Sequence, residues 1–256
     1  MSPKFETLTI VFDGAIACLS LNRPEKGNAF DADMHREFPE ALKLISNNPQ
    51  ARVLLLTGEG KTFSAGGDFS YIRQLRGDSA LRERSFVEGM EIFEGLGAMR
   101  IPVVTAVHGH AMGIGATLVA LSDISVAWTD AKIADPHVQI GLVAGDGGVI
   151  SWSSAIGFNR AKRYLLTGEA LTGAQAHAIG LVTDLADTPE EAFELLHLVE
   201  LDGEAAPLGP AREHPQQHLG PVLRVGAAGT RGERHDRATG VVLAREERLL
   251  LQPVDV

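Results

Sequence analysis

Residues 103–121 read VVTAVHGHAMGIGATLVAL, and local structure is expected to change within this short stretch. The β-branched run Val103–Val107 predicts a buried strand. Gly109 and Gly113 interrupt that pattern, and the small and apolar residues from Gly115 to Leu121 predict a helix. A glycine turn at the start of a helix leaves backbone N–H groups free at the positive end of the helix dipole. Such a turn is a suitable place for a developing negative charge.

A second glycine-rich turn, Phe63–Asp68 (FSAGGD), follows the short apolar run that begins at Val53. Its glycines let the backbone approach a ligand closely with free N–H groups. Either turn alone is compatible with a simple packing role, because glycines after a strand are common. The two together indicate a site built from backbone donors.

The remaining elements predict an α/β fold of repeated strand–strand–helix units. Asp13-Gly14 is typical of a tight turn between two strands, and the stripe from Met34 to Ile45 predicts a helix that Pro39 weakens. Consecutive strands without a helix between them argue against a doubly wound nucleotide-binding sheet. Strands are expected at residues 7–12, 15–20, 53–57, 103–107 and 124–128, and helices at 30–46, 115–121, 151–156, 161–166 and 188–199.

Composition limits the possible partners. The 256 residues are 45% hydrophobic and 22% charged, which is typical of a globular chain of one large domain with or without a short appendage. A net charge of −10 gives no overall basic field, so we expect no nucleic acid partner. An anionic ligand would have to meet a local basic patch.

Cellular location is expected to be cytoplasmic. Cys18 is the single cysteine, so the chain cannot form an internal disulfide, and this suits a reducing compartment. The charged start MSPKFE does not resemble an export signal. The long uncharged run 101–122 contains Pro102, His108 and several glycines, so it favours a strand, turn and helix over a membrane insertion.

Composition changes near residue 200, which predicts a core at 1–200 and an atypical segment at 201–256. The segment contains seven Arg but no Lys, Phe, Tyr or Trp, and glycines and prolines are scattered through it. One interpretation is a disordered tail. The other is a change of reading frame in a GC-rich coding sequence, which translation of the other two frames would test.

Several motifs occur in a distinctive order: NRPEKGNA at 22–29, the two glycine turns, GLVAGDGG at 141–148, YLLTG at 164–168 and AHAIGLV at 176–182. In these motifs the chain resembles the crotonase family, the enoyl-CoA hydratase/isomerase superfamily, over residues 5–199. The resemblance implies a spiral of repeated ββα units, an acyl-CoA or enoyl-CoA thioester ligand, a role in fatty acid metabolism, and a homotrimer or hexamer. It implies no separate cofactor, because coenzyme A is carried by the substrate.

The same resemblance implies roles for particular residues. The thioester oxygen would be held in an oxyanion hole made by the backbone amides of Gly67 and Ile114, in the two turns where free donors are expected. Residues implied to contact coenzyme A or the substrate are Lys26, Ala29, Ala65, Gly67, Asp68 and Gly113. Lys26 is the candidate for a phosphate contact, although an exposed lysine is also an ordinary solvated charge.

The sequence departs from the family where hydratases carry two glutamates, since Thr117 and His137 stand at those positions. Two carboxylates allow a site to deliver a water molecule and a proton together. Thr117 can do neither at neutral pH, and His137 can transfer at most one proton or can be a structural histidine at the end of a strand. A normal hydratase mechanism is therefore not expected.

Asp146, in GDGG, lies one position beyond the place where some isomerases of the family carry an active carboxylate, and it is our first choice as the base. Flanking glycines would equally suit an exposed turn aspartate. His108 and His110 would point to the same side of a strand and are expected to be packing residues, so no metal site is predicted. Ser64 and Thr117 lack the partners expected of a nucleophile.

The sequence therefore predicts an acyl-CoA enzyme that stabilises an enolate and transfers protons by isomerase-like or other single-base chemistry, with Asp146 and His137 as catalytic residues. One alternative is a non-catalytic acyl-CoA-binding protein of the same fold. A weaker alternative is a dinucleotide-dependent oxidoreductase that uses the turn at Gly109–Gly115. The acidic residue needed for that reading is missing, because the nearest candidate, Asp130, is expected in a turn.

Overall fold

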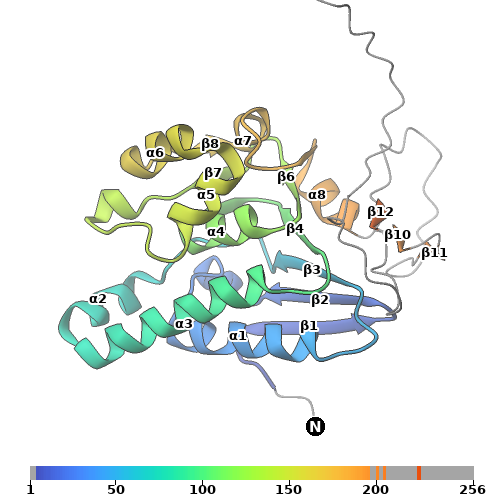
Figure 1. Ribbon diagram of the computed structural model, residues 1–256, viewed down its shortest axis with the longest axis horizontal. Helices are drawn as coiled ribbons and strands as arrows, with labels where there is room; N and C mark the ends of the chain where they lie inside the picture. The colour runs from blue at the N-terminus through green and yellow to red at the C-terminus, as the bar shows by residue number, and fades with distance from the viewer. Residues whose placement is uncertain (1–3, 197–199, 202–203, 206–223, 226–256) are drawn as a thin grey trace, which may run out of the picture.

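The computed structural model describes residues 4–196, 200–201, 204–205 and 224–225 (Figure 1). Most of the predicted segment 201–256 lies outside the described residues, so the boundary at residue 200 stays a prediction. The described pieces beyond residue 196 form the short strands β10 (Glu200–Leu201), β11 (Glu204–Ala205) and β12 (Arg224–Val225). Within the described parts of the chain, no helix combines the length and hydrophobicity needed to span a membrane.

A six-stranded sheet with the order β1-β2-β3-β4-β6-β9 forms the centre of the molecule. β1 and β2 are an antiparallel hairpin, and every later pair in this sheet is parallel. The order follows the chain without a point of reversal, unlike a dinucleotide-binding sheet. The strands are β1 (Leu8–Asp13), β2 (Ile16–Leu21), β3 (Val53–Gly58), β4 (Val103–Val107), β6 (Ile124–Trp128) and β9 (Asp184–Ala186).

A smaller sheet of β5 (His110–Met112), β7 (Lys132–Ala134) and β8 (Leu171–Thr172) lies next to the first. A single bridge from Ser64 to Ala111 of β5 brings the segment after β3 alongside this sheet. From β3 to β7 each successive strand of the large sheet is followed by a short strand or bridge of the small one and then by one or more helices. The predicted α/β class and the repeat of strands followed by helices are confirmed.

Helices cover both faces of the large sheet, which explains why every residue of β3 is buried. Leu54 and Leu56 belong to the larger core, whereas Leu55 faces a second cluster completed by Ala192 of α8. The helices are α1 (Ala32–Ser46), α2 (Phe69–Gly77), α3 (Ser79–Gly97), α4 (Ile114–Leu121), α5 (Gly148–Ile156), α6 (Phe158–Thr167), α7 (Gly173–Ala178) and α8 (Pro189–Leu196), with the 3-10 turns η1 (Pro24–Lys26) and η2 (His137–Ile140).

The expected hairpin, longer strands and helices are present, and α1 runs without interruption through Pro39. Its apolar stripe is buried against the core, including Met34 and Phe38, and this packing outweighs the local cost of the proline. The sequence analysis missed β5, β7, β8 and β9, which have only two or three residues each. Strands this short show no readable alternation.

The expected common orientation of His108 and His110 is wrong. His108 is 9% exposed, whereas His110 is exposed, so only His108 is a packing residue. The chain leaves the large sheet after Val107 and enters the small sheet at His110. The strand geometry that would align the two side chains therefore does not continue through Gly109.

Asn28 connects the turn after β2 with the loop after β3 and so fixes the segment that leads to the first glycine turn. The side chain is fully buried, and its amide donates to the carbonyl oxygens of Glu59 at 2.9 Å and Thr62 at 2.7 Å. Its carbonyl oxygen accepts from the Arg23 amide at 2.8 Å. The backbone has φ of +55°, in the left-handed region that asparagine tolerates better than most residues.

We predict that Asn28→Asp lowers the free energy of unfolding by about 3 kcal/mol, because two backbone carbonyls lose their donor and a carboxylate is buried in place of the amide. Urea unfolding measures this change. Asn159→Asp is the matched control, since Asn159 is exposed and makes no side-chain hydrogen bond among the described residues, and a change within about 0.5 kcal/mol is expected. Equal effects of the two substitutions would contradict this account of Asn28.

Candidate active site

Two glycine turns, residues 65–68 and 112–115, lie against one another. The backbone of Ser64 donates to the carbonyl of His110 at 2.9 Å and accepts from the amide of Met112 at 3.0 Å. Gly66 has φ of +90°, and a Cβ atom added there would lie 2.9 Å from the carbonyl oxygen of Met112. A side chain at residue 66 would therefore push the two turns apart.

The contact leaves the backbone amides of Gly67 in the first turn and Ile114 in the second without an acceptor among the described residues. The amide of Phe30 donates to the carbonyl oxygen of Gly66, and the amide of Asp68 donates to the carbonyl oxygen of Phe30. This pairing of Phe30 with the first turn does not use the N–H of Gly67. Ile114 is the first residue of α4, where an amide has no partner within the helix. Among the described residues, neither Gly67 nor Ile114 donates its N–H to a protein acceptor. Both residues line the same cavity.

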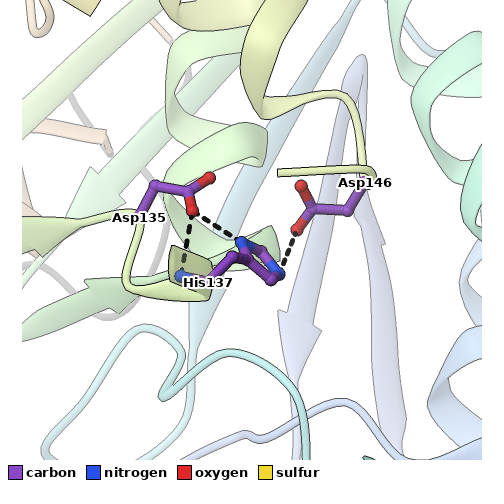
Figure 2. Close-up of side chains that lie close together, drawn as sticks. All are labelled: Asp135, His137 and Asp146. Atoms are coloured by element: carbon purple, nitrogen blue, oxygen red, sulfur yellow. Dashed lines mark hydrogen bonds and ion pairs between the residues drawn. The ribbon is translucent and has the colours of Figure 1, made fainter. Parts of the chain in front are cut away.

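Three side chains from separate elements meet beside these turns (Figure 2). Asp135 follows β7, His137 begins η2, and Asp146 lies in the turn before α5. Nδ1 of His137 lies 2.6 Å from Oδ1 of Asp135, and Nε2 lies 3.7 Å from Oδ2 of Asp146. The imidazole thus lies between two carboxylates. A Cβ atom added to Gly113 would be 3.4 Å from Cε1 of His137, so the ring also borders the second glycine turn.

The pKa values of His137 and Asp146 are both shifted from their ordinary values. Burial lowers the pKa of His137, but the hydrogen bond that the ring donates to Asp135 and the charges of Asp146 and Asp135 outweigh burial and leave the pKa raised. Burial raises the pKa of Asp146, an effect that the charge of His137 partly opposes. His137 and Asp146 can therefore share a proton in a range nearer neutrality than an exposed aspartate.

Thr117, at a position where the resemblance places a hydratase glutamate, also belongs to this group. It is 2% exposed, and its hydroxyl lies 3.4 Å from Oδ1 of Asp146. The amide of Gly148 donates to the same carboxylate oxygen at 3.3 Å. The structure thus brings together the three residues singled out in the sequence, Thr117, His137 and Asp146.

A cavity of about 180 Å³ connects the group with the glycine turns. Of the residues expected to contact substrate, the cavity wall contains Ala65, Gly67, Gly113, Ile114, His137 and Asp146. A larger cavity of about 440 Å³ lies elsewhere, between the loop at Gly60–Lys61 and α8. The smaller cavity is the better candidate for chemistry, because the free amides and the titratable group both face it.

Three of the residues expected to contact substrate lie outside this cavity wall. Lys26 is exposed at the end of η1, and the amide of Ala65 donates to the neighbouring Gly27 at 2.7 Å, which puts Lys26 next to the first turn. Ala29 is 7% exposed. Asp68 caps α2, accepting from the amides of Ser70 and Tyr71. Its carboxylate is therefore engaged in helix capping, and its expected substrate contact stays a prediction.

Asp135, His137 and Asp146 also resemble a metal-ligand group, since one ligand atom from each lies within 4.8 Å of the others. The short contact to Asp135 occupies Nδ1 of His137, however, so only Nε2 and Asp146 could share an ion. Two ligands are fewer than the three or four that protein metal sites commonly provide. The arrangement fits a histidine that is hydrogen-bonded to one carboxylate and lies close to a second better than it fits a metal centre.

Asp135 is the site residue that the sequence analysis missed, although it lies only two residues before His137, in the sequence Asp135-Pro136-His137. Its side chain is 1% exposed and one of its oxygens contacts the imidazole. A buried carboxylate two residues before a candidate proton-transfer histidine is a recognisable signal, because such histidines need a partner that sets the tautomer. Sequence spacing alone does not show that the carboxylate turns toward the ring.

Comparison with known proteins gives consistent results. The family model described as enoyl-CoA hydratase/isomerase matches residues 12–199. Crotonyl-CoA hydratase of Syntrophomonas wolfei is 33% identical over 189 residues, covering 73% of this chain and 71% of that protein. A probable enoyl-CoA hydratase of Mycobacterium leprae is 33% identical over 180 residues, covering 70% of this chain and 68% of that protein.

Solved structures give the same relationship. The crystal structure of an enoyl-CoA hydratase/isomerase from Mycobacterium paratuberculosis is 41% identical, with a TM-score of 0.71, over 76% of this chain and 80% of that chain. A putative enoyl-CoA hydratase/isomerase from Mycobacterium abscessus is 30% identical, with a TM-score of 0.69, over 73% of both chains.

We predict that Asp135→Asn lowers the pKa of His137, because the hydrogen bond and charge that favour the imidazolium are weakened. NMR titration of the His137 ring signals measures the change. Asp130→Asn, at an exposed turn position, is the control and should leave the titration unaltered. An unchanged or raised pKa of His137 in Asp135→Asn would show that Asp135 does not stabilise the charged ring.

Proposed function

The chain belongs to the enoyl-CoA hydratase/isomerase family, and from this premise we propose that it binds an acyl-CoA thioester and moves a proton next to the thioester carbonyl with a single carboxylate base. The substrate would be an enoyl-CoA whose double bond changes position. The observation that carries this proposal is the approach of Asp146 to Thr117. A carboxylate from the turn before α5 reaches the place where a hydratase would carry a glutamate on α4.

In this proposal the amides of Gly67 and Ile114 hold the thioester oxygen. Both lack an acceptor among the described residues, and both face the cavity. When a proton leaves the carbon beside the carbonyl, negative charge moves onto the thioester oxygen, and fixed donors stabilise that enolate more than they stabilise the ground state. Loss of one donor in a comparable site raises the barrier by about 2.7–4 kcal/mol.

Asp146 would act as the base and then as the acid. Its ionised form removes a proton from the carbon between the carbonyl and the double bond, which gives a dienolate. The protonated carboxyl then returns the proton at the far end of the conjugated system, so the double bond shifts and no water is consumed. Burial supports this role, since a raised pKa makes the carboxylate a stronger base than an exposed aspartate.

His137 would set the charge state of Asp146, and Asp135 would orient His137. With Nδ1 bound to Asp135, the imidazole presents Nε2 to Asp146 at 3.7 Å. A protonated His137 favours the ionised form of Asp146. Hydration fits less well, because the aligned hydratase positions are Thr117 and His137, and one carboxylate cannot both activate a water molecule and supply a separate proton in the same step.

Assembly and location extend the proposal: we infer a homotrimer or hexamer in the cytoplasm. Large apolar side chains are exposed along η2, the turn before α5, α5 itself and α6, including Val143 at 82% and Leu166 at 70%. A soluble monomer rarely exposes so many together, and a subunit contact would cover them. Light scattering should give three or six times the mass of one chain, and a monomer would contradict this part of the proposal.

We predict that Asp146→Asn abolishes most turnover while preserving thioester affinity, because the amide cannot accept the proton but keeps the shape of the side chain. A loss of about 10²- to 10⁴-fold in kcat is expected for removal of the general base. Calorimetric titration with coenzyme A and a panel of saturated, 2-enoyl and 3-enoyl thioesters measures binding, and turnover of each enoyl ester is followed in parallel.

The panel also tests the function as a whole. Saturable binding of thioesters with double-bond migration supports the proposal, whereas hydration of the same esters would overturn the single-base mechanism. Binding without turnover in the unaltered protein would favour the non-catalytic acyl-CoA-binding alternative. Asp184→Asn serves as a control, since Asp184 lies in β9 outside the cavity wall.

We predict that His137→Gln moves the acidic limb of the kcat/KM profile to higher pH. The charge of His137 lowers the pKa of Asp146, so its removal raises that pKa, and the base is ionised only at higher pH. Initial rates measured across the accessible pH range test the shift. His110→Gln, at an exposed position, should leave the profile in place. Movement of the limb to lower pH would contradict the proposed coupling.

A further inference from the structure

Arg23 belongs to the motif NRPEKGNA but has no part in the chemistry proposed above, and its guanidinium connects segments on either side of the first glycine turn. Nη2 of Arg23 lies 2.8 Å from Oδ2 of Asp31 and 3.5 Å from Oδ2 of Asp68. Nη1 donates to the carbonyl oxygen of Ala29. One side chain therefore joins the end of the motif to a residue that lies much later in the sequence.

The backbone of Gly67, one of the two proposed donors to the thioester oxygen, is held by its pairing with Phe30. The two residues form an isolated parallel bridge. In this bridge the amide of Phe30 donates to the carbonyl oxygen of Gly66 at 2.7 Å, and the amide of Asp68 donates to the carbonyl oxygen of Phe30 at 2.8 Å. The direction of the Gly67 N–H therefore depends on where the backbones of Phe30 and Asp68 lie.

The partners of Arg23 surround this bridge. Ala29 precedes Phe30 and Asp31 follows it, so Arg23 binds the chain on both sides of Phe30. Its third partner, Asp68, directly follows the residue whose amide is the proposed donor. The guanidinium thus contacts both strands of the bridge and none of the atoms expected to react.

The two carboxylates that bind Arg23 are themselves fixed. Asp31 caps α1 by accepting from the amide of Met34, and Asp68 caps α2 by accepting from the amide of Ser70. The side chains of Arg23 and Asp68 are only 15% and 11% exposed, so water screens this ion pair less than a surface pair. Arg23 therefore ties the first turns of two helices to one another.

The contacts require the planar fork of an arginine. A guanidinium presents several N–H donors in fixed directions, and here they reach two carboxylates and a carbonyl oxygen together. A lysine would supply one point charge on a flexible stem, which cannot hold three acceptors in one geometry.

We propose that Arg23 is a positioning residue for the oxyanion hole, because its guanidinium fixes the backbones of Phe30 and Asp68 so that the Gly67 amide points at the thioester oxygen. This inference rests on the proposed acyl-CoA function and adds a residue to that site. A displacement of about 1 Å in a catalytic group can cost about 10²-fold in rate, so a side chain that holds the donor in place affects turnover without touching the substrate.

Infrared difference spectroscopy of a bound, unreactive thioester tests the inference without turnover. The probe is butanoyl-CoA carrying ¹³C at the thioester carbonyl, added to the full chain at saturation. Hydrogen bonds from Gly67 and Ile114 should move the carbonyl stretch to lower wavenumber in the unaltered protein. Arg23→Met should keep about half of this shift or less, because one of the two donors is displaced.

Controls separate positioning of the donor from general loosening of the fold. Arg36→Met removes an ion pair to Asp33 whose side chains are about half exposed, and it should retain the full carbonyl shift. In Arg23→Met the NMR titration of His137 should stay unaltered, because the partners of Arg23 do not include the group at residues 135–146. A changed His137 titration would mean that Arg23 acts on the whole site, and the inference would be wrong.

Kinetics give a second readout. Arg23→Met should lower kcat for double-bond migration by about 10- to 100-fold and change KM by less than about threefold, because the displaced donor acts mainly on the enolate. Arg23→Lys should recover only part of the loss. Full activity of Arg23→Lys would show that charge alone is sufficient and would overturn the role of the fork.

A gentler variant keeps the test decisive where Arg23→Met does not fold. Asp31→Asn preserves a side chain that caps α1 but weakens the ion pair to Arg23, and it should reduce the carbonyl shift in the same direction. A full carbonyl shift in Asp31→Asn and in folded Arg23→Met overturns the inference and leaves the acyl-CoA function intact. Failure of the unaltered protein to bind the thioester or to shift its carbonyl overturns both.

Discussion

The site depends on the close approach of two glycine turns from distant parts of the chain. Two backbone hydrogen bonds join them, one donated by Ser64 to His110 and one accepted by Ser64 from Met112, and the absence of a side chain at Gly66 allows the carbonyl of Met112 to lie close by. Gly115 is under the same steric restriction, because an added Cβ atom there would lie 2.7 Å from the Cβ atom of Ser64. This contact brings the amide of Gly67 and the start of α4 to one cavity, and the surrounding sheets and helices hold the two turns in register.

Titratable groups are added to this backbone frame from a third region, residues 135–146. A hydratase of this family would be expected to carry glutamates at positions 117 and 137, but the chain carries threonine and histidine there. Asp146 brings a carboxylate next to Thr117, and Asp135 contacts His137 from the other side. The free backbone amides and the titratable side chains thus come from separate parts of the chain, so either set can change without the other.

Much of the fold could be predicted from local sequence. The hairpin at Asp13-Gly14, the buried strand at Val53 and the amphipathic stripe of α1 each carry a periodicity or turn signal that does not depend on distant residues. The small sheet could not be predicted, because β8 has two residues and is defined only by its partner β7. The long helix α3 was not predicted either. Only Ile92 and Leu96 of its residues are buried, so its apolar stripe is too narrow to give a clear helical periodicity.

The sequence by itself determined the two glycine turns, the presence of threonine at 117 and histidine at 137, and a candidate carboxylate at Asp146, because these are statements about residue types and order. Only the tertiary structure decided that Asp135 contacts His137, that His137 faces Asp146, and that the amides of Gly67 and Ile114 belong to residues of the same cavity wall. These groups come from different helices and loops, so their distances follow from packing and strand pairing across the chain rather than from local spacing.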